Sequence, residues 1–94
     1  MKKSISFDCL FSEDINLKFI KPFTLSYTIH DNYYLADHDD LGYLGFEKSL
    51  EKLEKDFKEH LIIDWQMYVT CPKEELSHDA LELRFKLEKL LQEF

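Results

Sequence analysis

Hydrophobic and polar residues alternate along the first third of the chain, and a period of two is typical of half-buried β-strands. The apolar positions fall in three runs: Ile5, Phe7, Cys9 and Phe11; then Ile15, Leu17 and Phe19; then Leu25, Tyr27 and Ile29. These runs predict three strands, of which the second stops before Pro22. The first predicted strand places Cys9 on its apolar face, where a reduced thiol behaves as a small hydrophobe.

A turn and a return strand follow the third run. Asp31 and Asn32 both tolerate positive φ, so they predict a two-residue turn that sets His30 opposite Tyr33. Residues 33–36 then return as a fourth strand. Residues 41–46 are predicted either as a short fifth strand or as a loop held against the sheet. Both glycines of the chain, Gly42 and Gly45, lie in this segment, so it holds the special backbone geometry.

The period changes to 3.6 in the second half, where apolar residues recur at spacings of three and four. The first such stripe is Phe46, Leu50, Leu53, Phe57, Leu61, Trp65 and Tyr68. It predicts a helix from about Glu47 to Val69, which Pro72 prevents from continuing. Ser77 is a good N-cap for a second helix. The stripe of that second helix is Ala80, Leu83, Leu87, Leu90 or Leu91, and Phe94.

These elements together predict one α+β domain over residues 1–94: an antiparallel sheet of three to five strands, covered on one face by two C-terminal helices. Ninety-four residues, 45% of them hydrophobic and 15% aromatic, suffice for one core but leave little volume for an enclosed active site. We therefore expect function to lie on a surface.

Charge and cysteine content narrow the classes of function. The net charge is −7 and neither half of the chain is basic, so direct nucleic-acid binding lacks its electrostatic attraction. An acidic protein suits a basic protein partner, or simply remains soluble. Two cysteines are too few for a disulfide framework. No segment approaches the roughly 20 apolar residues of a membrane span, so we expect a cytoplasmic protein without membrane contact.

Catalytic chemistry is poorly supported by the sequence. Residues 37–40, Asp-His-Asp-Asp, are the densest polar cluster, but alternate residues of an extended run point to opposite faces and calcium-loop spacing is missing. His60 and Asp64 share a helix face, which we interpret as a surface pair. Cys71 lies at a helix C-terminus, where the dipole disfavours a thiolate. We therefore expect a non-enzyme with no catalytic residue, metal or cofactor.

A family resemblance rests on three consecutive segments. They are Asn-Tyr-Tyr-Leu-Ala-Asp at 32–37, Leu-Gly-Tyr-Leu-Gly-Phe at 41–46 and Leu-Glu-Lys-Leu at 50–53. Over about residues 24–61 the chain resembles the bacterial HicB-type antitoxin module, with its aromatic strand, glycine-containing loop and acidic helix. Glu47-Lys48 stands where the family's usual helix cap would be, and nothing after Tyr68 resembles a DNA-binding tail. The resemblance implies a truncated RNase-H-like layer, without catalytic carboxylates, that covers a small basic RNase toxin.

The leading hypothesis is thus a non-enzymatic protein-binding module, an antitoxin-like or immunity-like neutraliser that captures a small basic toxin by charge steering. The contact residues that we expect at a sheet edge are Tyr33, Asp37, Asp39, Asp40 and Tyr43. A second hypothesis is a homodimeric scaffold that pairs its sheet edges or the flank formed by Ile62 and Ile63. A third is a metal-dependent hydrolase that uses residues 37–40. The identity of any partner, the oligomeric state and the roles of the cysteines stay open.

Overall fold

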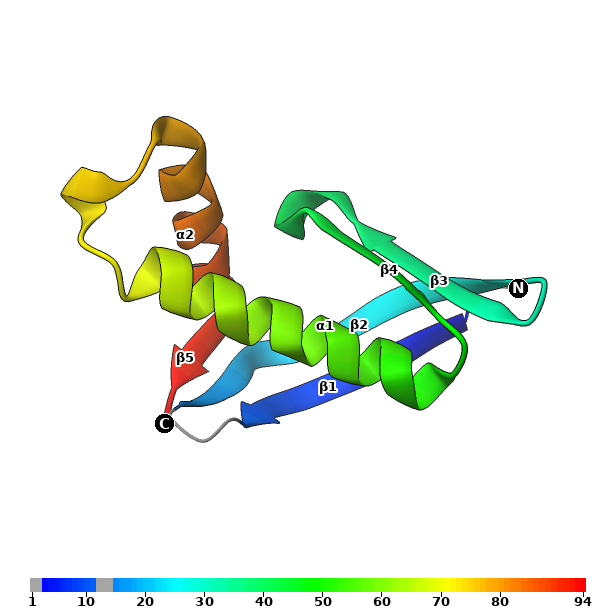
Figure 1. The fold of residues 1–94 in the computed structure, drawn as a ribbon. Helices are drawn as coiled ribbons and strands as arrows, with labels where there is room; N and C mark the ends of the chain where they lie inside the picture. Colours follow the sequence, from blue (N-terminus) through cyan, green and yellow to red (C-terminus); the bar gives the residue numbers. More distant parts are fainter. Residues whose placement is uncertain (1–2, 12–14) are drawn as a thin grey trace.

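The computed structural model describes residues 3–11 and 15–94, which form an antiparallel sheet of five strands and two C-terminal helices (Figure 1). The strands are β1 (Lys3–Phe11), β2 (Asn16–His30), β3 (Tyr33–His38), β4 (Tyr43–Glu47) and β5 (Leu91–Glu93), and the helices are α1 (Leu50–Asp64) and α2 (His78–Leu90). Short helical turns are η1 (Asp39–Leu41), η2 (Trp65–Val69) and η3 (Lys73–Glu75). The predicted α+β class is confirmed.

β2 is the central strand of the sheet. β1 pairs with one of its edges, and the other edge is shared by two strands. β5 pairs with residues Leu17 to Phe19, and β3 pairs with residues Tyr27 to His30. Between these two partners, no strand of the described chain pairs with residues 20–26 on that side. The sheet therefore has an opening in its middle, which α2 and η1 partly cover.

The predicted strand end before Pro22 is wrong, because β2 continues through it. The register shifts between the pairs Phe7–Phe23 and Cys9–Lys18. Between these two pairs β2 advances by five residues, from 23 to 18, whereas β1 advances by two, from 7 to 9. Pro22 lies exposed in this irregular section, where a missing N–H interrupts no regular ladder.

The same shift changes which β1 side chains face the core. Leu10 is fully buried, whereas Phe11 is 64% exposed and packs edge-on against Phe94. The predicted alternation with Phe11 inside is therefore wrong beyond the bulge. Cys9 is only partly buried, as is Cys71, and both are free thiols.

The turn between β2 and β3 confirms the prediction made from Asp31 and Asn32. Their φ angles are 49° and 69°, and His30 pairs with Tyr33 as expected. The segment predicted as strand or loop is the strand β4, which follows η1. Gly42 ends η1 with a φ of +63°, a conformation that favours glycine.

Both helices begin at serine caps. The Ser49 hydroxyl accepts from the Lys52 N–H at 3.2 Å, so α1 begins at Leu50 rather than Glu47. Its helical path continues through η2 to Val69, close to the predicted end. Ser77 caps α2 as predicted, but α2 ends at Leu90 and the last described strand is β5. Neither helix of the described chain combines the length and the apolar character that crossing a membrane needs.

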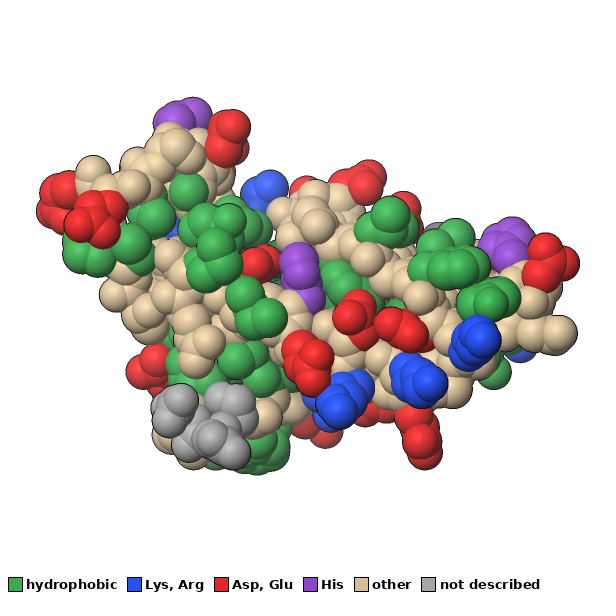
Figure 2. All heavy atoms as spheres, viewed as in Figure 1, with side chains coloured by type: hydrophobic (Ala, Val, Ile, Leu, Met, Phe, Trp, Pro, Cys, Tyr) green, Lys and Arg blue, Asp and Glu red, His purple; other side chains and the backbone are tan. Residues whose placement is uncertain are grey.

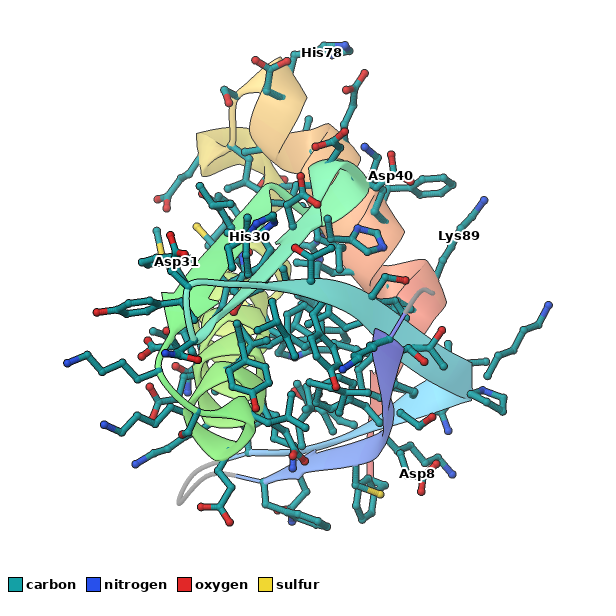
Figure 3. All side chains as sticks on the ribbon, turned by 90° about the vertical axis from the view of Figure 1, so that its right-hand side faces the viewer. Asp8, His30, Asp31, Asp40, His78 and Lys89 are labelled. Atoms are coloured by element: carbon teal, nitrogen blue, oxygen red, sulfur yellow. The ribbon has the colours of Figure 1, made fainter. Side chains whose placement is uncertain are left out.

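The core is organised around one aromatic residue of α1. Phe57 has no exposed surface, and its ring lies 5.1 Å from that of Phe7 in β1, 5.7 Å from Phe23 in β2 and 4.8 Å from Tyr43 in β4. Leu53 and Leu61 are equally buried on the same stripe. The strands curve around these side chains, and α1 closes one side of the curve (Figure 3).

We expect Phe57→Ala to lower the free energy of unfolding by about 3–5 kcal/mol, since it leaves a cavity that three strands line. Equilibrium denaturation in urea measures the change. Lys55→Ala, an exposed position on the same helix, is the control and should stay within about 0.5 kcal/mol of the parent. A loss below about 1 kcal/mol for Phe57→Ala would show that this ring does not hold the sheet to α1.

Candidate interaction surface

The β3–β4 hairpin presents two faces of different chemistry, because successive side chains of a strand point to opposite sides. Ala36 pairs with Gly45 on the inner face, where both are buried. A Cβ at Gly45 would collide with the Tyr43 ring and lie 2.9 Å from a Leu53 methyl carbon, so a side chain here would force Tyr43 and Leu53 to shift. The alternate residues face away from the core and form the outer face.

The outer face carries exposed hydrophobic side chains. Leu35 lies opposite Phe46, and Leu44 lies two residues before Phe46 on the same face. The Tyr33 and Phe46 rings stack with centroids 4.6 Å apart at an interplanar angle of 7°. Phe46 is 56% exposed and Leu44 is 73% exposed. We call these four residues, Tyr33, Leu35, Leu44 and Phe46, the outer hairpin surface.

Charged residues border this surface. Asp37 is exposed and pairs with Leu44 across the hairpin, and Asp31 lies in the turn at its end. The Lys48 Nζ lies 6.0 Å from the centre of the Tyr33 ring. Figure 2 shows hydrophobic side chains gathered over the β3–β4 hairpin, with charged side chains around them. An apolar centre with a polar rim is the usual anatomy of a protein interface.

The structure separates the five contact residues that the sequence predicts. Tyr33 and Asp37 lie on β3, and both belong to the outer face or its border. Asp39 and Asp40 lie in η1, past the end of β3 that is opposite to Tyr33. At roughly 3.3 Å per residue, about 17 Å of strand separates the two ends. The five residues therefore do not form one patch.

Tyr43 belongs to the inner face, so the prediction that it contacts a partner at the surface is corrected. Its side chain is 4% exposed, and its hydroxyl donates a hydrogen bond to Asp56 Oδ2 at 2.8 Å. Burial, and secondarily Asp56 and Glu47, raise the pKa of Tyr43 above its ordinary value. Tyr43 is thus a core residue that ties β4 to α1.

Sequence reasoning missed Leu44 and Phe46 as surface residues. Phe46 lies four residues before Leu50, so its spacing matched the helical stripe, yet it belongs to β4. The signal that could have found both is the alternation of residues 43–46, in which every second residue is Leu or Phe. Only the pairing with β3 decides that these two face outward.

Residues 37–40 do not converge on a metal site. Asp37 points outward and His38 inward, as alternate strand residues do. In the part of the chain that the structure describes, no three His, Cys, Asp or Glu side chains are grouped so as to hold a metal ion. The hydrolase hypothesis therefore has no ligand set among these residues.

Two other sites that the sequence singles out for possible chemistry are the His60–Asp64 pair and Cys71. His60 Nε2 lies 3.1 Å from Asp64 Oδ2, and the predicted surface pair is only partly exposed, since the side chain of His60 is 30% exposed and that of Asp64 13%. Burial raises the pKa of Asp64, and His60 acts in the opposite direction. Burial and Glu75 raise the pKa of the Cys71 thiol against the influence of Arg84. The raised pKa disfavours the thiolate form of Cys71.

No family model, curated protein or solved structure matches the chain. The three segments that carry the resemblance to HicB-type antitoxins form β3, the end of η1 with β4, and the first turn of α1. The outer hairpin surface thus lies within the resembling part of the chain.

We expect Tyr43→Phe to lower the free energy of unfolding by about 1 kcal/mol, because it removes the hydrogen bond to Asp56 and keeps the ring. Tyr33→Phe, on the outer face, is the matched control and should change stability by less than about 0.3 kcal/mol. Thermal and urea denaturation measure both variants. Equal effects of the two substitutions would contradict the structural role of the Tyr43 hydroxyl.

The raised pKa of Asp64 gives stability a pH dependence. Its carboxyl binds a proton more readily in the folded than in the unfolded chain, so its contribution is most favourable below the unfolded value and is lost as pH rises through the folded value. Relative to Asp64→Asn, the parent should therefore lose stability over a pH range that begins at the ordinary pKa of an aspartate carboxyl, about 4, and extends upward. Urea denaturation across this range measures the difference. A difference that grows in favour of the parent as pH rises would contradict it.

Proposed function

We propose that the protein is a non-enzymatic binding module that neutralises a small basic protein, in the manner of an antitoxin or an immunity protein. The observation that carries the proposal is the outer hairpin surface, an exposed apolar patch on an acidic protein. Large exposed apolar side chains grouped together are typical of interaction sites.

The stacked rings of the patch support a role as an interface anchor. Tyr33 and Phe46 come from two paired strands, which hold the two rings together without a partner. A preorganised surface loses little side-chain freedom on association. Aromatic residues of this kind dominate the binding energy in many interfaces.

The negative net charge of the protein supports a basic partner. The net charge is −7, and Asp31 and Asp37 lie at the border of the patch. A partner of opposite charge is steered toward such a protein and associates faster at low ionic strength. The resemblance to HicB-type antitoxins implies the same kind of target, a small basic RNase. We accordingly propose that the protein acts in the cytoplasm, where such an RNase would degrade RNA.

The test uses the product of the reading frame next to this gene as the probe, coexpressed and then purified separately. We expect a complex whose association slows about tenfold as NaCl rises from about 50 to about 500 mM. Phe46→Glu should weaken binding by at least about 30-fold, since it places a charge at the centre of the patch. Biolayer interferometry measures both changes.

Phe85→Glu is the matched control, because Phe85 is 59% exposed on α2 and Phe46 is 56% exposed on β4. We expect Phe85→Glu to change the affinity by less than about twofold. Circular dichroism of both variants checks that they fold. A salt-insensitive homodimer that Phe46→Glu dissociates, with no binding of the neighbouring product, would overturn the proposal in favour of the scaffold hypothesis.

A further inference from the structure

A hollow lies at the opening of the sheet, away from the outer hairpin surface. Its volume is 270 Å³, and it is lined by the middle of β2, the end of β3, η1 and α2. Phe23, Leu41 and Leu90 supply an apolar lining. The hollow is there because β5 and β3 pair with the two ends of β2 and leave residues 20–26 without a strand on that side. α2 packs over this gap without filling it.

The lining suits a flat apolar group. The Phe23 and His38 rings lie 5.5 Å apart at an angle of 38°, and both line the hollow. Drug-sized ligands occupy pockets of about 300–1,000 Å³, so a hollow of 270 Å³ suits a smaller molecule with a single ring. Offset or tilted packing of such a ring on Phe23 is favourable.

The charged residues that line the hollow, two lysines and one aspartate, are net positive although the whole chain is acidic. Lys86 and Lys89 of α2 both line it. Lys86 Nζ donates to the Asp40 carbonyl oxygen at 3.3 Å and lies 3.9 Å from the Asp40 carboxylate, so these two charges offset each other. Lys89 forms no ion pair with any described residue, and its Nζ lies 4.3 Å from the centre of the Phe85 ring. Figure 3 shows Asp40 and Lys89 on the same side of the molecule.

His38 contributes its ring to the lining. Its Nδ1 is buried and has no hydrogen-bond partner among the described residues, which is uncommon in folded proteins. Because this atom is buried, the hollow offers a ligand the ring of His38 rather than its Nδ1.

We propose that this hollow binds a small aromatic monocarboxylate, with the ring against Phe23 and Leu90 and the carboxylate near Lys89. One unpaired lysine beside a neutralised Lys86–Asp40 pair favours a single negative charge over a multiply charged anion. This binding site is separate from the outer hairpin surface, and it does not depend on the proposed capture of a basic protein.

The test titrates benzoate into the ¹⁵N-labelled chain and follows the amide resonances. We expect shifts at residues around Phe23, His38 and Leu90, with a dissociation constant of about 1–10 mM, as befits a ligand of nine non-hydrogen atoms. Benzamide keeps the ring and removes the charge, and it should bind at least about fivefold more weakly. Lys89→Gln should weaken benzoate binding by a similar factor.

Lys73→Gln is the matched control, since it removes the same charge from η3, outside the residues that line the hollow. It should leave the benzoate titration unchanged. The absence of shifts at up to about 20 mM benzoate would overturn the proposal. Equal binding of benzamide, or equal effects of Lys89→Gln and Lys73→Gln, would also overturn it, because recognition would then not involve this lysine.

Discussion

The contact between Phe57 and three strands is the constraint on which the rest of the structure depends. Its ring meets Phe7, Phe23 and Tyr43, which come from β1, β2 and β4. A curled sheet of this size leaves an open side, and a small domain has little apolar surface with which to close it. α1 closes that side with a stripe of buried side chains. The positions of β1 and β4, the first and last strands in the order β1-β2-β3-β4, therefore follow from the packing of a single helix.

This constraint also determines what the surface can offer. The inner face of β4 is committed to α1, since Tyr43 bonds to Asp56 and Gly45 leaves room for Leu53. The strand period of two then directs Leu44 and Phe46 outward. The apolar outer hairpin surface is therefore a direct consequence of how β4 packs against α1. The same logic places the hollow beside Phe23, because β2 is longer than either of its partners on that side.

The two surfaces differ in the ligands that they suit. The outer hairpin surface is open, apolar at its centre and bordered by charged residues, which favours a folded protein partner. The hollow is small and concave, and the charged residues that line it are net positive, which favours a small anion. The outer hairpin surface lies on the outward face of β3 and β4, whereas the inward-facing His38 and η1 line the hollow, so Asp37 borders the one and Asp40 lines the other.

The local sequence determined those features that depend on residues close together in the chain. The two-residue turn at Asp31 and Asn32, the Ser77 cap of α2 and the buried part of the α1 stripe at Leu53, Phe57 and Leu61 follow from backbone preference, capping and periodicity, and the structure confirms each. The α+β class follows from the change of period between the two halves.

Strand pairing decided the rest, because register depends on residues far apart in sequence. Pairing with β1 on both sides of Pro22 carries β2 through this residue, and the accompanying shift turns Leu10 inward and Phe11 outward. Pairing with β3 assigns Phe46 to a strand, although its spacing also fits a helix. The alternation of residues 43–46 divides them into two faces, but only the packing of α1 selects which face becomes the core, so tertiary structure alone buried Tyr43 and exposed the candidate interaction surface.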